Sequence, residues 1–203
     1  MSETKSMMIA GVGGQGTLLA SKILGNLFTQ AGYEVKVSEI HGMSQRGGSV
    51  VTYVKWGGRV YSPLVDKGEA DYLLAFELLE AARASQFLRP GGVLIASSQE
   101  ILPMPVITGS AAYPQAVPQA LAEACDRTIV VDALAAAQEA GSSRAANVVL
   151  LGVLSTVLDG FTPDQWQQAL AASIRPQLLE LNGRAFALGR RLAPTPTKEE
   201  QPT

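Results

Sequence analysis

Four glycines near the start of the chain stand where they could form an anion-binding turn. They are Gly11, Gly13, Gly14 and Gly16, within the run Gly-Val-Gly-Gly-Gln-Gly. Glycine permits sharp turns and brings bare backbone N–H groups close to a ligand. A helix after such a turn also presents unpaired N–H groups and the positive end of its dipole to an anion. The same turn can instead serve only the close packing of a strand on a helix.

A second polar segment, residues 41–48, follows the next predicted strand, residues 33–40. Ligands gather outside the carboxyl ends of strands in open α/β sheets, so this segment is a candidate for the same site. Arg46 suits an anion because its rigid guanidinium fork matches phosphate or carboxylate. It can equally pair with an acid on another subunit. Further candidate ligand contacts are Gln15, Ser44, Gln45, Gly47 and Gly48.

Four other polar residues have a functional and a structural interpretation. His41 could shuttle a proton because its reference pKa lies near 6.5, but a lone loop histidine is more often a structural hydrogen-bonding residue, which we favour. Asn147 could reach a ligand, satisfy loop backbone groups or cap a helix. Glu77 and Glu80 could cap and solvate a helix start.

The elements around these residues predict one Rossmann-like α/β domain over residues 1–192, with a mainly parallel sheet flanked by helices. A strand from Met7 enters the glycine turn, and a helix then runs to about Ala31, with Gly32 as its cap. The Gly57-Gly58 pair indicates a β-hairpin excursion into residues 60–62. Further expected segments are strands at 49–55, 72–76, 93–96 and 128–132, an extended piece at 103–109, helices at 77–87, 114–125, 133–140, 145–158, from Thr162 and at 176–192, and a disordered tail at 193–203.

The composition limits which classes of function are open to this chain. The chain has 203 residues, a net charge of −2, one cysteine and one histidine. The weak net charge argues against a basic nucleic-acid-binding face. No apolar run reaches the length of a membrane span, and the N-terminus lacks the pattern of a secretory signal, so we expect a cytoplasmic protein. A lone thiol, Cys125, cannot form an intramolecular disulfide and is expected to be a small core residue.

With these motifs the chain resembles a known family, the gamma domain of the 2-oxoacid:acceptor oxidoreductases. Within it, the small (beta) subunits of indolepyruvate:ferredoxin oxidoreductase are most similar. The resemblance rests on the glycine turn and on Glu-Ile-His-Gly-Met-Ser-Gln-Arg-Gly-Gly-Ser-Val over residues 39–50. Ala70-Asp71, Phe-Glu-Leu-Leu-Glu-Ala-Ala-Arg over residues 76–83, and Asn-Val-Val-Leu-Leu-Gly over residues 147–152 add to it. It extends over residues 7–192. Where relatives carry Gly-Asn before the last apolar helix, this chain has Gly141-Ser142-Ser143-Arg144.

The resemblance implies oxidative decarboxylation of an aryl 2-oxo acid, such as indolepyruvate, with coenzyme A. The products are an acyl-CoA, carbon dioxide and two electrons for ferredoxin. That chemistry needs thiamine diphosphate with Mg²⁺ and [4Fe–4S] clusters. This chain has neither a Gly-Asp-Gly diphosphate motif followed by paired asparagines nor clustered cysteines. A large alpha subunit is therefore expected to hold these cofactors, while this chain shapes the active-site or coenzyme A pocket.

Two other functions remain open at this stage. A stand-alone NAD(P)-binding oxidoreductase would use the glycine turn together with Glu39, which lies where dinucleotide-binding folds place a ribose-binding acid. A purely structural assembly protein would bind no ligand at all.

Overall fold

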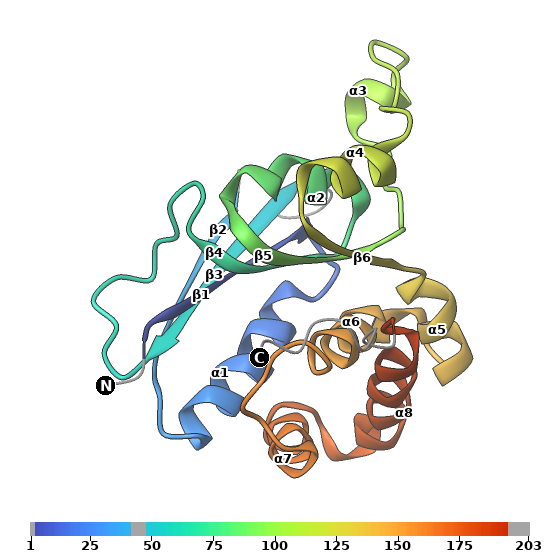
Figure 1. The fold of residues 1–203 in the computed structure, drawn as a ribbon. Helices are drawn as coiled ribbons and strands as arrows, with labels where there is room; N and C mark the ends of the chain where they lie inside the picture. Colours follow the sequence, from blue (N-terminus) through green and yellow to red (C-terminus); the bar gives the residue numbers. More distant parts are fainter. Residues whose placement is uncertain (1–2, 42–47, 195–203) are drawn as a thin grey trace.

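The structure is a computed structural model that describes residues 3–41 and 48–194. Within these ranges the chain folds into a single sheet with helices on both faces (Figure 1). Its strands are β1 (Lys5–Val12), β2 (Glu34–His41), β3 (Ser49–Gly57), β4 (Ala70–Ala75), β5 (Leu88–Ser97) and β6 (Arg127–Val131). Its helices are α1 (Thr17–Gln30), α2 (Leu78–Ala84), η1 (Ser85–Phe87), α3 (Met104–Ile107), α4 (Val117–Ala124), α5 (Ala133–Ala140), η2 (Ser143–Ala145), α6 (Ala146–Leu154), α7 (Pro163–Ser173) and α8 (Pro176–Leu192).

The sheet has six strands in the order β2-β3-β1-β4-β5-β6 within the described residues. Neighbours from β1 through β4 and β5 to β6 are parallel, whereas β3 runs antiparallel to both β1 and β2. The expected α/β fold with a mainly parallel sheet is therefore confirmed. The carboxyl ends of β1, β4, β5 and β6 share one edge of the sheet, which β3 joins with its amino end.

Alternating side chains of β1 face two separate hydrophobic cores. Met7 and Ile9 pack with α1, α5, α6, α7 and α8, while Met8 and Ala10 pack with α2 and α4. All four side chains are buried, as expected of a central strand covered on both faces. The helix after β1 and the helix after β4 thus lie on opposite faces. The crevice between those strand ends is the topological switch point, where ligands bind in open α/β sheets.

The helical caps follow their local sequence. Thr162 accepts a hydrogen bond from the Gln165 N–H, and the Gln165 side chain accepts from the Thr162 N–H, which completes a capping box. Gly32 follows the last turn of α1 with φ of +85°. The expected helix start at Thr162 and the expected glycine stop after Ala31 are both confirmed.

Two sequence expectations are wrong in detail, and a third is not tested. The hairpin consists of β2 and β3, paired from Glu34↔Gly57 to His41↔Val50, and residues 60–62 form no strand. The Gly57-Gly58 pair therefore ends β3 rather than joining two strands. The piece at 103–109 contains helix α3, because Pro103 and Pro105 occupy the cap and second positions, where proline is tolerated. The tail beyond residue 194 lies outside the described residues.

Candidate functional site

The glycine turn between β1 and α1 needs glycine at two positions for its backbone conformation. Gly14 has φ of +102° and Gly16 has φ of +86°, both in the left-handed region. A third glycine is required by contact, since a Cβ on Gly11 would lie 3.0 Å from the Gln15 Oε1 and 3.2 Å from the Phe76 Cβ. Gly16 is also the N-cap of α1 and has no side chain to occupy the first amides of that helix. The turn therefore leaves backbone donors facing the sheet edge.

Gln15 joins three strand ends through its side-chain amide. Its Oε1 accepts a 2.7 Å hydrogen bond from the Val12 N–H, and its Nε2 donates to the Phe76 carbonyl at 2.9 Å and to the Gln99 Oε1 at 3.1 Å. Val12 ends β1, Phe76 follows β4 and Gln99 follows β5. The predicted ligand contact at Gln15 is therefore a residue whose amide hydrogen bonds are made within the protein.

Asn147 connects the first turn of α6 to the glycine turn. It is buried, its Nδ2 donates to the Gly16 carbonyl at 3.2 Å, and its Oδ1 accepts from the Val148 N–H at 2.8 Å. The amide thus satisfies one loop carbonyl and one early helix N–H. The N-cap of α6 is Ala145, one residue outside the helix, so Asn147 acts from within the first turn.

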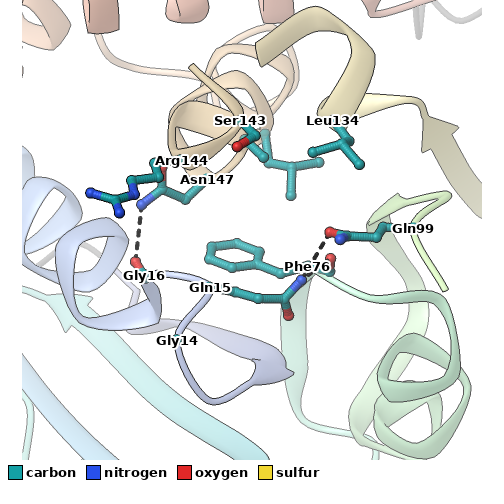
Figure 2. Close-up of a pocket in the computed structure, with 11 residues that line it drawn as sticks. Gly14, Gln15, Gly16, Phe76, Gln99, Leu134, Ser143, Arg144 and Asn147 are labelled. Carbon is teal, nitrogen blue, oxygen red and sulfur yellow. Dashed lines mark hydrogen bonds between the residues drawn. The ribbon is translucent and has the colours of Figure 1, made fainter. Parts of the chain in front are cut away.

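A cavity of about 330 Å³ opens at the switch point, and we call it the switch-point pocket. Figure 2 shows the Phe76 ring in its centre, with Arg144 and Asn147 on one side and Gln99 on the other. Its lining comes from the turn after β1, the ends of β4 and β5, and the starts of α5 and α6. The lining residues are Gly14, Gln15, Gly16, Phe76, Gln99, Leu134, Ser143, Arg144, Ala146, Asn147 and Leu150.

A second cavity of about 330 Å³, which we call the edge pocket, lies on the hairpin side of the same turn. Glu39 and His41 of β2 line it, together with glycines of the turn. The Gly13 N–H donates to the Gly48 carbonyl at 2.9 Å, which holds the turn against the start of β3. The edge-pocket lining is Gly13, Gly14, Gly16, Thr17, Leu18, Glu39, His41 and Val50.

The structure brings Gly13, Gly14, Gly16, Gln15 and Asn147 together, and it places His41 and Gly48 beside the same turn. The predicted contacts Ser44, Gln45, Arg46 and Gly47 lie outside the described residues. Gly11 lies at the end of β1, where it makes room for Gln15 and Phe76.

The two predicted cap carboxylates are buried rather than solvated. Glu77 is 1 % exposed and accepts hydrogen bonds from the Glu80 N–H, the Ile101 N–H and the Tyr113 hydroxyl. Glu80 is 4 % exposed, accepts from the Ser49 hydroxyl at 2.6 Å and pairs with an Arg83 guanidinium. Glu77 does cap α2, as expected, but both acids tie separate segments together. Burial, followed by the neighbouring Glu77 carboxylate, raises the pKa of Tyr113.

Sequence reasoning missed seven lining residues of the switch-point pocket, namely Phe76, Gln99, Leu134, Ser143, Arg144, Ala146 and Leu150. Phe76, Gln99 and Leu134 each come within three residues of a strand's carboxyl end. That position was an available signal, because such residues gather at one sheet edge. Arg144 was noticed only as part of a departure from the family's pattern.

Comparison with known proteins shows the family of this chain. Residues 6–192 match the family described as Pyruvate ferredoxin/flavodoxin oxidoreductase. The chain belongs to this family. It is similar to "Indolepyruvate oxidoreductase subunit IorB" of Thermococcus kodakarensis, with 40% identity over 193 residues that cover 93% of this chain and 95% of that protein. Family membership thus confirms the resemblance drawn from the residues.

Two solved structures share the fold. The gamma subunit of a keto/oxoacid ferredoxin oxidoreductase from Geobacter sulfurreducens has a TM-score of 0.68 at 23% identity, covering 93% of this chain and 98% of that one. A 2-oxoglutarate:ferredoxin oxidoreductase from Magnetococcus marinus, with 2-oxoglutarate, coenzyme A and succinyl-CoA bound, has a TM-score of 0.70 at 20% identity. It covers 95% of this chain but only 31% of that chain. Members of this fold therefore occur both as short subunits and within much longer chains.

The topology also departs from a plain dinucleotide-binding order, in which the second strand pairs with the first. Here β3 lies between β1 and β2, so Glu39 stands two strands away from the strand that carries the glycine turn. Glu39 also accepts a 3.4 Å hydrogen bond from the Thr52 hydroxyl. No helix in the described ranges is both long enough and apolar enough to cross a membrane.

Proposed function

We propose that this chain is the small subunit of an indolepyruvate-type 2-oxoacid:ferredoxin oxidoreductase. The enzyme would oxidatively decarboxylate an aryl 2-oxo acid with coenzyme A and pass two electrons to ferredoxin. The observation that carries this proposal is the 40% identity to an indolepyruvate oxidoreductase subunit along nearly the full length of both chains. Related proteins named as ketoisovalerate oxidoreductase subunits are less similar, at 28% identity, which favours the aryl substrate.

The cofactors of this chemistry belong on a larger partner subunit. A [4Fe–4S] cluster takes four thiolates, whereas this chain has one cysteine, which is buried in a hydrophobic core. Within residues 3–41 and 48–194 no three carboxylate, histidine or cysteine side chains gather as a metal site. The donor set of this chain therefore does not fit an iron–sulfur cluster, and no electron-transfer step is assigned to it.

The proposed task of this chain is to complete a coenzyme A pocket. The glycine turn offers backbone donors at the sheet edge, and His41 and Gly48, which flank Arg46 in the sequence, lie beside that turn. Phosphate groups suit such donors because backbone N–H groups and a guanidinium all favour an anion. The partner's active site would face this edge of the sheet.

Co-purification tests the assembly. We expect the tagged chain, isolated gently from its own cells, to bring down a much larger brown subunit. The complex should reduce ferredoxin when given indolepyruvate and coenzyme A. A colourless chain that purifies alone and binds NAD(P)H tightly would instead favour the stand-alone dehydrogenase.

The coenzyme A contact needs a separate experiment on the assembled complex. We expect Arg46→Ala to raise the KM for coenzyme A about tenfold, the usual scale for losing a charge-assisted hydrogen bond to an anion. The control is Arg59→Ala, an exposed arginine beyond β3 at the opposite edge of the sheet. An unchanged KM together with weaker subunit association would assign Arg46 to the interface.

A further inference from the structure

Residues 101–116, between β5 and α4, form a projection that we call the apolar arm. Figure 1 shows it carrying α3 beyond α4 and away from the sheet. Helix α3 has no buried residue. Leu102, Met104 and Ile107 are between 48 % and 66 % exposed. Met104 and Ile107 are three positions apart in α3, so they share one face of that helix. The arm thus presents large apolar side chains that the rest of the described chain leaves uncovered.

The arm carries no charged side chain. Residues 101–122 contain no aspartate, glutamate, lysine, arginine or histidine, although 17% of the chain is charged. The loop at residues 58–69 also exposes apolar side chains, Tyr61 and Leu64, but it contains four charged residues. Exposed apolar side chains without charged neighbours are typical of the core of a protein interface. The lack of cations argues against nucleic acid phosphates or anionic lipid as the ligand.

One buried carboxylate holds the two ends of the arm together. The Glu77 Oε1 accepts hydrogen bonds from the Ile101 N–H at 3.1 Å and from the Tyr113 hydroxyl at 3.0 Å. Within the arm, the Ser110 hydroxyl donates to the Pro105 carbonyl at 3.0 Å. The arm therefore has a defined shape before any partner binds, which lowers the entropy cost of association.

The arm leaves the sheet beside the switch-point pocket. Gln99 lines that pocket, and Leu102 follows three residues later. A chain spans at most about 3.6 Å per residue, which places the Cα atoms of these two residues within about 11 Å of each other. One side of a standard protein interface covers about 800 Å², equivalent to a disc about 30 Å across. A subunit that covered this pocket would therefore also reach the arm.

We propose that the apolar arm is a docking surface for the large subunit, with Leu102, Met104 and Ile107 packing against an apolar, uncharged surface of that subunit. This inference rests on the proposed function, which requires a larger subunit whose active site faces this edge of the sheet. It goes beyond that function by naming a surface that assembles the enzyme. The facing surface of the large subunit is uncharged, because an unpaired charge buried against the arm would be costly.

Charges introduced into the arm test this contact. We expect Met104→Glu and Ile107→Glu each to weaken binding of the large subunit at least about tenfold, because each buries a carboxylate without a partner. The matched control is Leu64→Glu, at a leucine whose exposure lies in the same range, and it should leave binding unchanged. Competition between each full-length variant and the unchanged chain for the large subunit measures the relative affinity. All three sites are exposed, so urea unfolding should change little.

Hydrogen–deuterium exchange locates the contact without any substitution. The amides of residues 104–111, except that of Pro105, should exchange at least about tenfold more slowly in the assembled complex than in the chain alone. Equal competition by the two arm variants and the control, or unchanged exchange on assembly, would overturn the proposal.

Other occupants of the arm give different results. A dimer of this chain that Ile107→Glu dissociates would assign the arm to a second copy, and recovery with membranes that Ile107→Glu abolishes would assign it to a lipid surface. Either result overturns the proposal. An active complex that tolerates both arm variants contradicts the docking surface alone. A complex that depends on the arm but reduces no ferredoxin supports the docking surface and contradicts the proposed function.

Discussion

Gly16 illustrates how a single hydrogen atom in place of a side chain supports the site. Its φ of +86° lies in the left-handed region, and a Cβ there would come within 2.4 Å of the Asn147 Nδ2. Gly14, with φ of +102°, has no atom within 4 Å of the position of its Cβ. Both glycines thus need a left-handed backbone conformation, but only Gly16 also has no room for a side chain.

We therefore expect Gly16→Ala to lower the free energy of unfolding by about 2–4 kcal/mol, because it combines backbone strain with a buried collision. Gly14→Ala should lower it by about 1–2 kcal/mol, the strain alone. Urea unfolding followed by circular dichroism measures both. Equal losses would show that Asn147 moves aside without cost.

Tyr113 makes the stability of the folded chain depend on pH in the alkaline range. Burial, with Glu77 beside it, raises the pKa of the Tyr113 phenol above its usual value near 10. Above that pH the unfolded chain releases this proton while the folded chain keeps it. The folded state then binds more protons, so stability falls as pH rises.

We expect Tyr113→Phe to make the free energy of unfolding decline less steeply above about pH 10 than it does in the unchanged chain. Tyr72, whose pKa is also raised by burial, should leave part of the decline in place. Urea unfolding at a series of alkaline pH values makes the comparison. Parallel curves for the two proteins would contradict the assignment to Tyr113.

Helices α6 and α8 pack backbone against backbone at two glycines. A Cβ on Gly189 would lie 1.9 Å from the Val149 carbonyl oxygen, and one on Gly152 would lie 2.2 Å from the Phe186 carbonyl oxygen. The neighbours are backbone atoms, which cannot rotate away. Because α6 begins at the switch-point pocket, this contact also fixes where Asn147 and Arg144 stand.

Gly189→Ala should lower the free energy of unfolding by about 3 kcal/mol or more, since the two helices must separate. Gly183→Ala, on the same helix with no atom within 4 Å of its Cβ position, is the matched control. It should raise stability by about 0.5–1 kcal/mol through helix propensity. Thermal unfolding compares them, and a destabilised Gly183→Ala would show that α8 tolerates no added methyl group.

Sequence patterns predicted elements where the signal is local. The helix start at Thr162 and the glycine stop after α1 depend only on neighbouring residues, and both are present. The hairpin was misplaced because its partners are chosen by burial across the sheet. Trp56 and Val54 of β3 pack into the core beneath β1, so β3 inserts between β1 and β2.

The same reasoning explains what was missed at the site. A glycine-rich turn can be recognised from residue type alone, so this turn was predicted from the sequence. Gln99 and Arg144 are common surface residue types. Their place in the pocket depends on the assembled fold, since Gln99 accepts a hydrogen bond from Gln15, 84 positions away, and Arg144 lies in η2 between α5 and α6. Only the assembled sheet shows that these two polar side chains line the pocket.

The chain has one thiol, that of Cys125, and its reactivity can report whether the chain unfolds cooperatively. Cys125 is 7 % exposed in the core beneath α2 and α4, on the opposite face from α6 and α8. Burial raises the pKa of its thiol, and only the thiolate reacts readily with disulfide reagents.

We expect Cys125 to react with such a reagent at least about 100-fold more slowly in the folded chain than in urea. Labelling at increasing urea concentrations gives the free energy of opening this face. Agreement with the unfolding measured by circular dichroism would show that both layers unfold together. Rapid labelling without urea would show that the α4 side opens independently.

The hydrogen bonds around Gln15 and Asn147 join residues 61, 84 and 131 positions apart in the chain. Contacts of such long range close late during folding, because the entropy of loop closure must be met first. The pocket is thus complete only after β1, β4, β5 and α6 have docked. A ligand bound there recognises the finished fold alone, so it slows unfolding and shifts the folding equilibrium by mass action without guiding the chain toward it.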